Sequence, residues 1–386
     1  MPPHYRITMN SYAPIHLTQI CAGFELLRKQ GKLRYTFRRE NPSPTLGRPH
    51  FGHSAYLYAA DEDGTATVFD THDKGWLQLP PADFDADMET LNVRAYCRRS
   101  YRPELYTESK YALLQKPLGL NYHVSCPHNP YLQMSLRDWR EANEPWRKHT
   151  LHRKLVSLMP PVPRFGLYSD ALFYPNAFTQ PPDHETDGTV LFLCRNWFPL
   201  GEDPNVSADL PVEKQVELQI AHNPALETIY NMDLNRAALI RALRDTYGPK
   251  AIAGMTDTAF SRLLFPDLIE RGTILQRSNF LAAIKKADVC LATIGLHQST
   301  GWKFAEYVAA AKAIVSEHPY YTTVGDFSAG QNYLGFASLE EAMHLVESLL
   351  LNPQKRFAMQ AANSAYYQAF MAPDVLVARA LELSLV

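Results

Sequence analysis

The sequence predicts an α/β protein with two domains in series. Short apolar runs alternate with helical patterns along most of the 386 residues, and strands that alternate with helices require crossover connections and parallel sheets. A proline-rich stretch at residues 159–188 breaks both periodicities and separates the two halves. Hydrophobic residues make up 46% of the chain and charged residues 20%, as in globular proteins. We therefore expect domains at residues 1–180 and 181–370 and a C-terminal helix at 371–386.

The first domain is predicted to open with a strand and a helix. Leu17, Ile20, Phe24 and Leu27 recur at spacings of three or four residues, which is the period of a helix that buries one face. The Asp-Gly pair at residues 63–64 is typical of a turn between two strands. The elements expected here are a helix at residues 15–28 and strands at 6–9, 33–37, 54–60, 65–70 and 92–97.

The second domain has the cleaner pattern. Residues 189–194 form a continuous apolar run, which is typical of a strand buried on both faces. Ser338 and Glu341 form a capping box, which predicts the start of a helix. The other elements expected are strands at residues 250–253, 273–275, 288–293, 313–316 and 333–336, and helices at 233–247, 279–286, 302–311 and 338–351.

Composition excludes several classes of protein. The five cysteines lie far apart and form no Cys-x-x-Cys pair, which favours reduced thiols over a disulfide framework or a zinc site. No apolar stretch reaches the roughly 18 residues of a membrane-spanning helix. The first residues also lack the pattern of a secretory signal. We therefore expect a soluble, cytoplasmic protein.

Charge is divided unequally between the two halves. Residues 1–180 carry 22 Lys and Arg against 17 Asp and Glu, and the remaining residues carry 16 against 23. A net charge of −2 does not supply the basic surface that nucleic-acid binding needs, so no nucleic-acid partner is expected. The positive excess is typical of ordinary solvated surface. It also fits contact with anionic lipid or a phosphorylated glycan, which would place the protein peripherally at the inner face of the membrane.

The strongest candidate for a binding site lies where a predicted strand of the second domain turns into a helix. In parallel sheets the ligand crevice lies at the carboxyl ends of the strands, where this loop must be. The helix begins near Gly301, and its first turn offers free N–H groups and the positive end of the helix dipole to an anion. Ser299 and Thr300 add hydroxyl groups just before it.

Lys303 and Glu306 follow in the first two turns of that helix. They are three residues apart and therefore share one face. This face places a cation near a phosphate and a carboxylate one turn deeper, where it suits ribose hydroxyls. A core helix with a Lys–Glu pair on its surface would show the same spacing.

The segment that begins at Glu306 reads Glu-Tyr-Val-Ala-Ala-Ala-Lys-Ala-Ile-Val. It resembles the donor-site helix of GT-B glycosyltransferases, usually written Glu-Ala-Met-Ala-x-Gly-Lys-Pro-Val-Val. Ala311 and Ala313 stand where the family has Gly and Pro. Many retaining members carry an earlier glutamate in a Glu-x7-Glu pattern, and Gln298 takes its place here, which argues against retaining chemistry of the usual type.

The resemblance implies two Rossmann-like domains facing a cleft. It implies a glycosyltransferase that moves a sugar from a nucleotide-sugar donor to a glycan, a lipid-linked or another acceptor, as in polysaccharide biosynthesis, without a metal or redox cofactor. Glu306 would bind the donor ribose, and Arg195 resembles the family's phosphate-side arginine, although an inter-domain salt bridge would also explain it. The C-terminal helix would pack back on the first domain.

Two further functions fit the same plan. A sugar-nucleotide epimerase shares the two-domain plan. A non-catalytic module that binds a sugar nucleotide or a glycan would need the same scaffold without the chemistry.

A general base for an inverting transfer must come from the first domain, because the acceptor hydroxyl has to lose its proton as it attacks. His16 lies after the first predicted strand, and Asp70 and Asp73 lie at and beyond the end of another. Each of the three also fits a structural or surface role. Arg98 and Arg99 are candidates for binding an acidic or phosphorylated acceptor, or for ordinary solvated surface.

Overall fold

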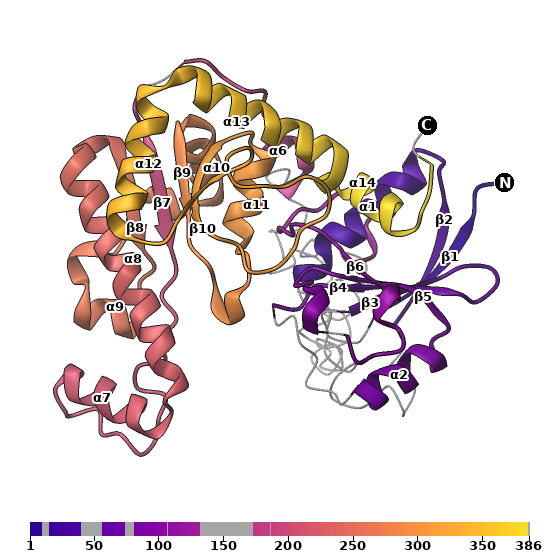
Figure 1. Cartoon of the computed structure of the whole chain (residues 1–386), viewed down its shortest axis with the longest axis horizontal. Helices are drawn as coiled ribbons and strands as arrows, with labels where there is room; N and C mark the ends of the chain where they lie inside the picture. The colour runs from indigo at the N-terminus through magenta and orange to yellow at the C-terminus, as the bar shows by residue number, and fades with distance from the viewer. Residues whose placement is uncertain are drawn as a thin grey trace, which may run out of the picture. The chain divides into compact units, whose positions relative to one another are not determined.

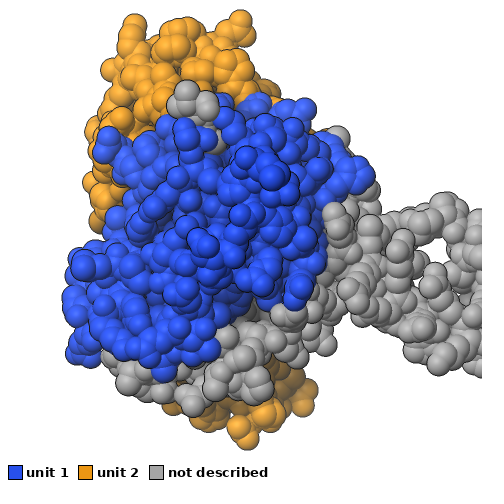
Figure 2. Space-filling view, turned by 90° about the vertical axis from the view of Figure 1, so that its right-hand side faces the viewer, with its two compact units in different colours: residues 1–179, 321–326, 366–386 blue, residues 180–320, 327–365 orange. Residues whose placement is uncertain are grey.

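The computed structural model describes residues 1–9, 15–39, 56–73, 81–105, 107–131, 173–185 and 187–384. The chain divides into two compact units, coloured separately in Figure 2. Unit 1 comprises Met1–Thr179, Tyr321–Asp326 and Tyr366–Val386, and unit 2 comprises Gln180–Tyr320 and Phe327–Ala365. The C-terminal residues therefore belong to the same unit as the N-terminal half of the chain.

Unit 1 is built on a mixed sheet. Its strands within the described residues are β1 (His4–Met9), β2 (Arg34–Arg39), β3 (Tyr56–Ala60), β4 (Ala66–Asp70), β5 (Val93–Arg98) and β6 (Gln115–Pro117). They lie in the order β2-β1-β3-β4-β5-β6. Strand β3 is antiparallel to both of its neighbours, and the other pairs are parallel. The carboxyl ends of β1, β4 and β5 therefore lie at one edge of the sheet.

Helices cover both faces of this sheet. Those used below are α1 (Thr18–Lys29), α2 (Pro81–Thr90) and α14 (Pro373–Ala380). Leu57 and Phe69 belong to the core that α1 and α14 cover, whereas Tyr58 and Val68 belong to the core that α2 covers. Neighbouring residues of each strand thus face opposite layers, as the pleat requires. Helices α1 and α14 lie side by side (Figure 1).

Unit 2 is built on a parallel sheet. Its strands within the described residues are β7 (Val190–Cys194), β8 (Ala251–Met255), β9 (Val289–Ala292), β10 (Ala313–Glu317) and β11 (Leu334–Phe336). They lie in the order β11-β10-β9-β7-β8. After β7 the chain forms β8 on one side of β7, and it then returns to form β9 on the other side of β7. The carboxyl ends of β7 and β9 therefore flank a topological switch point, which is where open α/β sheets form a ligand crevice.

Helices also cover both faces of the second sheet. They are α7 (Val212–His222), α8 (Ala225–Tyr247), α9 (Ala259–Leu264), α10 (Arg277–Lys286), α11 (Trp302–Ala309), α12 (Leu339–Leu351) and α13 (Pro353–Tyr366). Alternate residues of the strands, among them Phe192 and Leu291, share one core with α8 and α12. Helix α11 packs on β9 and β10 and is absent from that core cluster. The mixed α/β architecture with two parallel-rich sheets agrees with the prediction from sequence.

Most predicted elements are confirmed. A few differ from the prediction in where they begin or end, and one differs in its type of secondary structure. The strand expected at residues 273–275 is a 3₁₀ helix, Thr273–Leu275. Leu275 is 55% exposed, and the place beside β8 is taken instead by a bridge between Ile269 and Met255. The helix expected at 233–247 begins at Ala225, two turns earlier. Ser338 caps α12 as predicted, but the Glu341 carboxylate accepts a hydrogen bond from the Ala337 N–H rather than from Ser338.

Other predictions lie outside the described residues or have shorter counterparts. Residues 159–172 of the expected linker are outside the described ranges, as are residues 54–55 of a predicted strand. The helix expected at 15–28 consists of a 3₁₀ turn, Ile15–Leu17, followed by α1. Strand β6 and helices α2, α7, α9 and α13 are elements that the sequence patterns did not predict. None of the helices in the described part of the chain is long and apolar enough to cross a membrane.

Candidate functional site

The six candidate binding residues of unit 2 lie at the carboxyl edge of its sheet. Arg195 directly follows β7, on one side of the switch point. Ser299, Thr300 and Gly301 lead into α11 on the other side, and Lys303 and Glu306 lie in its first two turns. The structure therefore places these residues in the segments that follow β7 and β9 and in the first two turns of α11. It places the three candidate bases in unit 1, and they are described separately below.

The loop before α11 is tightly folded. His297 and Gln298 both have positive φ, 57° and 61°, within the 3₁₀ turn Leu296–Gln298. The Gly295 N–H donates to the Ser299 carbonyl at 2.8 Å, which closes the loop on itself. Gly301 is the N-cap residue, and no side chain caps the helix. The Phe304 N–H donates to the Gly301 carbonyl at 3.2 Å, which closes the first turn of α11.

Lys303 makes a contact that the sequence did not predict. Its Nζ donates to the Leu193 carbonyl of β7 at 2.6 Å, so the side chain spans the switch point from α11 to β7. Burial lowers the pKa of this ammonium group below its ordinary value, and nearby Cys194 and Glu306 oppose the shift. An ammonium group carries three donors, so a contact with one carbonyl leaves capacity for an anion.

Glu306 is almost fully buried and is held by an arginine from another helix. Its Oε1 accepts a hydrogen bond from Arg277 at 3.0 Å. Arg277 is the first residue of α10. The contact with Arg277 therefore fixes the orientation of the Glu306 carboxylate.

Arg195 is exposed and stacks on an aromatic ring. Its guanidinium carbon lies 4.4 Å from the centre of the Trp197 ring. It forms no ion pair with any residue of the described part of the chain. Stacking orients a guanidinium while leaving its N–H groups available to a phosphate or carboxylate.

Two residues of α8 that sequence reasoning missed join the loops on either side of the switch point. Asp233 accepts hydrogen bonds from the N–H groups of Trp197 and Phe198, and Arg236 donates to Thr293 and to main-chain carbonyls. Burial raises the pKa of Asp233, and its two main-chain donors oppose that shift. The only sequence signal was an Asp and an Arg three residues apart in a predicted helix, which is common on exposed surfaces.

Asp70 in unit 1 sits within a buried network. The carboxylate accepts hydrogen bonds from the His72 N–H at 2.9 Å, from His72 Nδ1 at 3.0 Å and from the Tyr96 hydroxyl at 3.2 Å. Arg98 NH1 lies 3.6 Å from it, and Arg98 is itself 1% exposed. Burial alone would raise the pKa of Asp70, but the His72 contacts and the Arg98 charge hold it below its ordinary value. These contacts make Asp70 a poor proton acceptor.

Asp73 and His16 lie beside this network. Asp73 Oδ1 pairs with Arg99 NH1 at 2.6 Å, and the Asp73 side chain is 41% exposed. The Ser100 hydroxyl donates to the carbonyl groups of His72 and Asp73, which fixes the loop after β4. Burial and the charge of Arg99 lower the pKa of His16 to about 4. The structure thus gathers all three candidate bases at one edge of the sheet.

The arginines Arg98 and Arg99 are less accessible than the sequence suggested. Arg98 is 1% exposed and pairs with Asp70 at the end of β4, and Arg99 is 7% exposed and pairs with Asp73 in the loop that follows. Arg98 also stacks on the Tyr96 ring at 4.4 Å. Neither is ordinary solvated surface, and their charges face aspartates of the same unit.

The low pKa of His16 predicts a pH dependence of stability. Its ordinary pKa is 6.5, so the unfolded chain binds the proton at a higher pH than the folded chain. The free energy of unfolding should therefore fall by about 2 kcal/mol between pH 7 and pH 5 through this residue, and stay level above pH 7. Urea denaturation of the wild type and of His16→Gln at both pH values measures the contribution. An equal pH dependence in the two proteins would contradict it.

Comparison with known proteins gives little further information. No protein-family model matches the chain, and no curated protein matches it. Among solved structures, crystal structures of Anabaena Alr3699/HepE in complex with UDP-glucose and with UDP cover 98% and 99% of this chain and 99% of that chain. The identities are 9% and 10%, and the TM-scores are 0.39 and 0.42. Similarity at this level assigns neither a family nor a function to the chain.

Proposed function

We propose that the protein is a glycosyltransferase of the GT-B type. It would transfer a sugar from a nucleotide-sugar donor, held by unit 2, to a glycan, a lipid-linked or another acceptor. The observation that carries the proposal is the placement of Glu306. The residue that matches the family's ribose-binding glutamate lies in the second turn of a helix whose N-terminus opens at the switch point of a parallel sheet. That is where such sheets bind nucleotides.

The end of α11 supports the same proposal. Ala311 has φ +50°, the left-handed conformation that favours glycine. The Lys312 N–H donates back to the Tyr307 carbonyl across this turn, as at a helix end closed by a left-handed residue. The family pattern has glycine at this position. The chain therefore keeps the backbone conformation that the family's glycine serves, with alanine in its place.

The charges at the crevice suit a leaving diphosphate. The first turn of α11, the hydroxyls of Ser299 and Thr300 and the ammonium group of Lys303 would face the donor phosphates from one loop, and Arg195 from the other. Fixed donors aimed at developing negative charge lower the barrier to its departure. In this proposal the chain's own cations stabilise the charge, and the reaction requires no metal or redox cofactor.

The proton acceptor would come from the cluster in unit 1. Asp70 is occupied by Arg98, His72 and Tyr96, so it would orient its neighbours and not accept a proton. His16, which is neutral at pH 7, and the half-exposed Asp73 remain as candidate bases. One of these groups would accept the proton of the acceptor hydroxyl as that hydroxyl attacks the donor sugar.

Direct titration tests the donor site. UDP, ADP, GDP and TDP are each titrated into the protein by calorimetry, and the corresponding UDP-, ADP-, GDP- and TDP-glucose are incubated with it without acceptor. Binding of at least one diphosphate and slow release of that diphosphate from its sugar nucleotide support a transferase. Binding without any release would favour a non-catalytic binding module. If none of the four diphosphates binds, the proposal is wrong.

Glu306→Gln is predicted to weaken binding of the nucleoside diphosphate by about 1–3 kcal/mol, which is the scale of a hydrogen bond to a charged group. Glutamine keeps the shape of the side chain, but its neutral amide oxygen accepts hydrogen bonds from the ribose hydroxyls less strongly than a carboxylate does. Calorimetry on the folded variant measures the loss. The double variant Glu306→Gln/Arg277→Gln is the control, because it removes the arginine that the single change leaves without its carboxylate. Recovery of affinity in the double variant would show that Glu306 acts only by pairing with Arg277.

A further inference from the structure

We propose that Asp233 and Arg236 of α8 are positioning residues that set the geometry of the phosphate side of the nucleotide crevice. They tie together the loops that follow β7 and β9. This inference rests on the proposed function, because it concerns the same crevice. Neither residue is expected to touch the ligand.

Arg236 reaches both sides of the switch point. Its Nε donates to Thr293 Oγ1 at 3.0 Å and its NH2 to the Ile294 carbonyl at 2.8 Å, both in the loop after β9. Its NH1 donates to the Arg195 carbonyl at 2.7 Å, in the loop after β7. One planar guanidinium therefore fixes the distance between the two loops.

Asp233 completes the link on the β7 side. Its Oδ2 accepts from the N–H groups of Trp197 at 2.7 Å and Phe198 at 2.9 Å. Its Oδ1 lies 3.4 Å from Arg236 NH1. Asp233 is fully buried and Arg236 is 5% exposed, so water does not replace these contacts.

The hydrogen-bond partners of Asp233 and Arg236 indicate that the pair positions the two loops and does not only stabilise unit 2. A buried ion pair is often no more stabilising than apolar residues of the same size, so its presence needs another reason. Here the hydrogen bonds go to the residues on either side of the crevice. Arg236 donates to the carbonyl group of Arg195, which is itself a candidate binding residue. It also donates to the carbonyl group of Ile294, near the start of the loop that ends at Gly301. The apolar face of α8 already anchors the helix through Leu239, Ile240 and Leu243.

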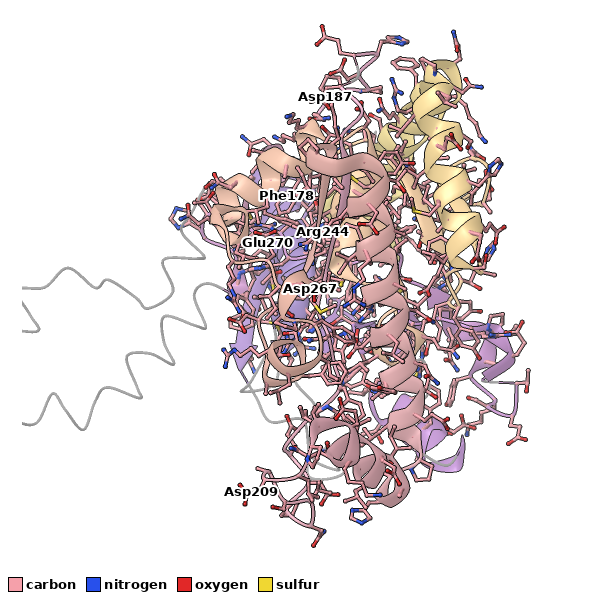
Figure 3. All side chains as sticks on the ribbon, turned by 90° about the vertical axis from the view of Figure 1, so that its left-hand side faces the viewer. Phe178, Asp187, Asp209, Arg244, Asp267 and Glu270 are labelled. Carbon is pink, nitrogen blue, oxygen red and sulfur yellow. The ribbon has the colours of Figure 1, made fainter. Side chains whose placement is uncertain are left out.

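The same helix offers a matched control. Arg244, labelled in Figure 3, also donates to main-chain carbonyls, from Nε to Ala253 at 2.8 Å and from NH1 to Asp267 at 2.7 Å. Ala253 lies within β8 and Asp267 lies beyond it, so neither belongs to the loops of the switch point. A change at Arg244 removes the same kind of hydrogen bond from the same helix without touching the crevice.

The test compares Arg236→Lys with Arg244→Lys. Lysine keeps the charge but has no planar fork, so it cannot serve carbonyls on both loops. UDP, ADP, GDP and TDP and the nucleosides uridine, adenosine, guanosine and thymidine are titrated into each variant and into the wild type. For the diphosphate that the wild type binds, Arg236→Lys should raise Kd at least tenfold. The Kd of its nucleoside should rise less than threefold, because Glu306 lies on α11 and Arg277 on α10, away from the two loops that Arg236 joins.

Hydrogen–deuterium exchange gives a second measurement that needs no ligand. In Arg236→Lys, exchange should rise together at residues 195–198 and 293–301, whereas Arg244→Lys should leave both segments unchanged. The milder Thr293→Val removes only one acceptor and should raise the diphosphate Kd about threefold, which keeps the test available if Arg236→Lys does not fold.

The outcomes separate this inference from the proposed function. If the wild type binds none of the four diphosphates, the proposed function is wrong and the inference falls with it. If the wild type binds one and Arg236→Lys and Thr293→Val bind it equally well, only the inference is wrong. The inference also fails if Arg236→Lys and Arg244→Lys lose the same affinity, or if diphosphate and nucleoside weaken by the same factor, because the pair would then only stabilise unit 2.

Discussion

Replacing Asp70 with asparagine is expected to lower the free energy of unfolding by about 3–5 kcal/mol, because removing one partner of a buried ion pair leaves the other charge in an apolar environment. The partner is Arg98, which is 1% exposed and stacks on Tyr96. Asparagine keeps the shape and accepts a hydrogen bond from His72, but it carries no charge. Urea denaturation, with hydrogen exchange of residues 56–73 to assign the loss to unit 1, measures the effect.

Asp73→Asn is the matched control for this prediction. Asp73 lies three residues after Asp70, in the loop that follows β4, and its pair with Arg99 involves a side chain that is 41% exposed. Partly exposed pairs contribute up to about 1 kcal/mol, so this variant should be nearly as stable as the wild type. If Asp70→Asn is equally stable and loses only transferase activity, Asp70 acts in the chemistry and the structural interpretation is wrong. Asp70→Asn/Arg98→Met should recover part of the stability, because both charges are then gone.

The sequence could not separate these two aspartates. Asp70 was predicted at the end of a strand and Asp73 in the loop beyond it, and both were candidates for the same role as a general base. What distinguishes them is that Asp70 and Arg98 are register partners on the adjacent parallel strands β4 and β5. That pairing depends on the strand order, which no local pattern encodes.

Strands with a continuous apolar run were predicted best. The strands predicted at residues 189–194 and 288–293 contain β7 and β9, whose residues Val190–Cys194 and Val289–Ala292 are all apolar and buried, as in a strand covered on both faces. Strand β6, Gln115–Pro117, has no such run and was missed. The reverse error occurred at Thr273–Leu275, where an apolar β-branched run forms a 3₁₀ helix at the surface. Runs of three residues are too short to show a period, so tertiary context decides their structure.

The candidate binding site was predicted in its local features. The loop, the helix start at Gly301 and the shared face of Lys303 and Glu306 all follow from spacing within a dozen residues. The residues that contact Lys303 and Glu306 do not follow from local spacing. Arg277 and the Leu193 carbonyl come from other elements, and only the fold brings them to Glu306 and Lys303.

The packing of the C-terminal helix α14 on α1 depends on a glycine in the middle of α1. Helix α14 packs on α1 within unit 1 and adds Leu376, Val377 and Leu381 to its core. The Gln19 side chain donates to the Met371 carbonyl at 2.9 Å and holds the chain just before that helix. Gly23 in the middle of α1 permits the close approach. A glycine inside a predicted helix is unfavourable by itself, and it signals close packing whose partner the sequence does not name.

Gly23→Ala is therefore predicted to destabilise unit 1 by about 3 kcal/mol or more, above the usual range for overpacking. An added Cβ would lie 2.1 Å from the Pro373 carbonyl oxygen and 2.5 Å from Val377 Cγ2, so the backbone of α14 must move. Helix propensity alone predicts the opposite sign, a gain of roughly 0.5–1 kcal/mol. Thermal denaturation gives the sign, and hydrogen exchange should rise in α14. Val377→Ala in the same chain should not restore stability, because the closest clash is with a main-chain atom. A more stable Gly23→Ala protein with unchanged exchange in α14 would mean that α1 and α14 do not pack this closely.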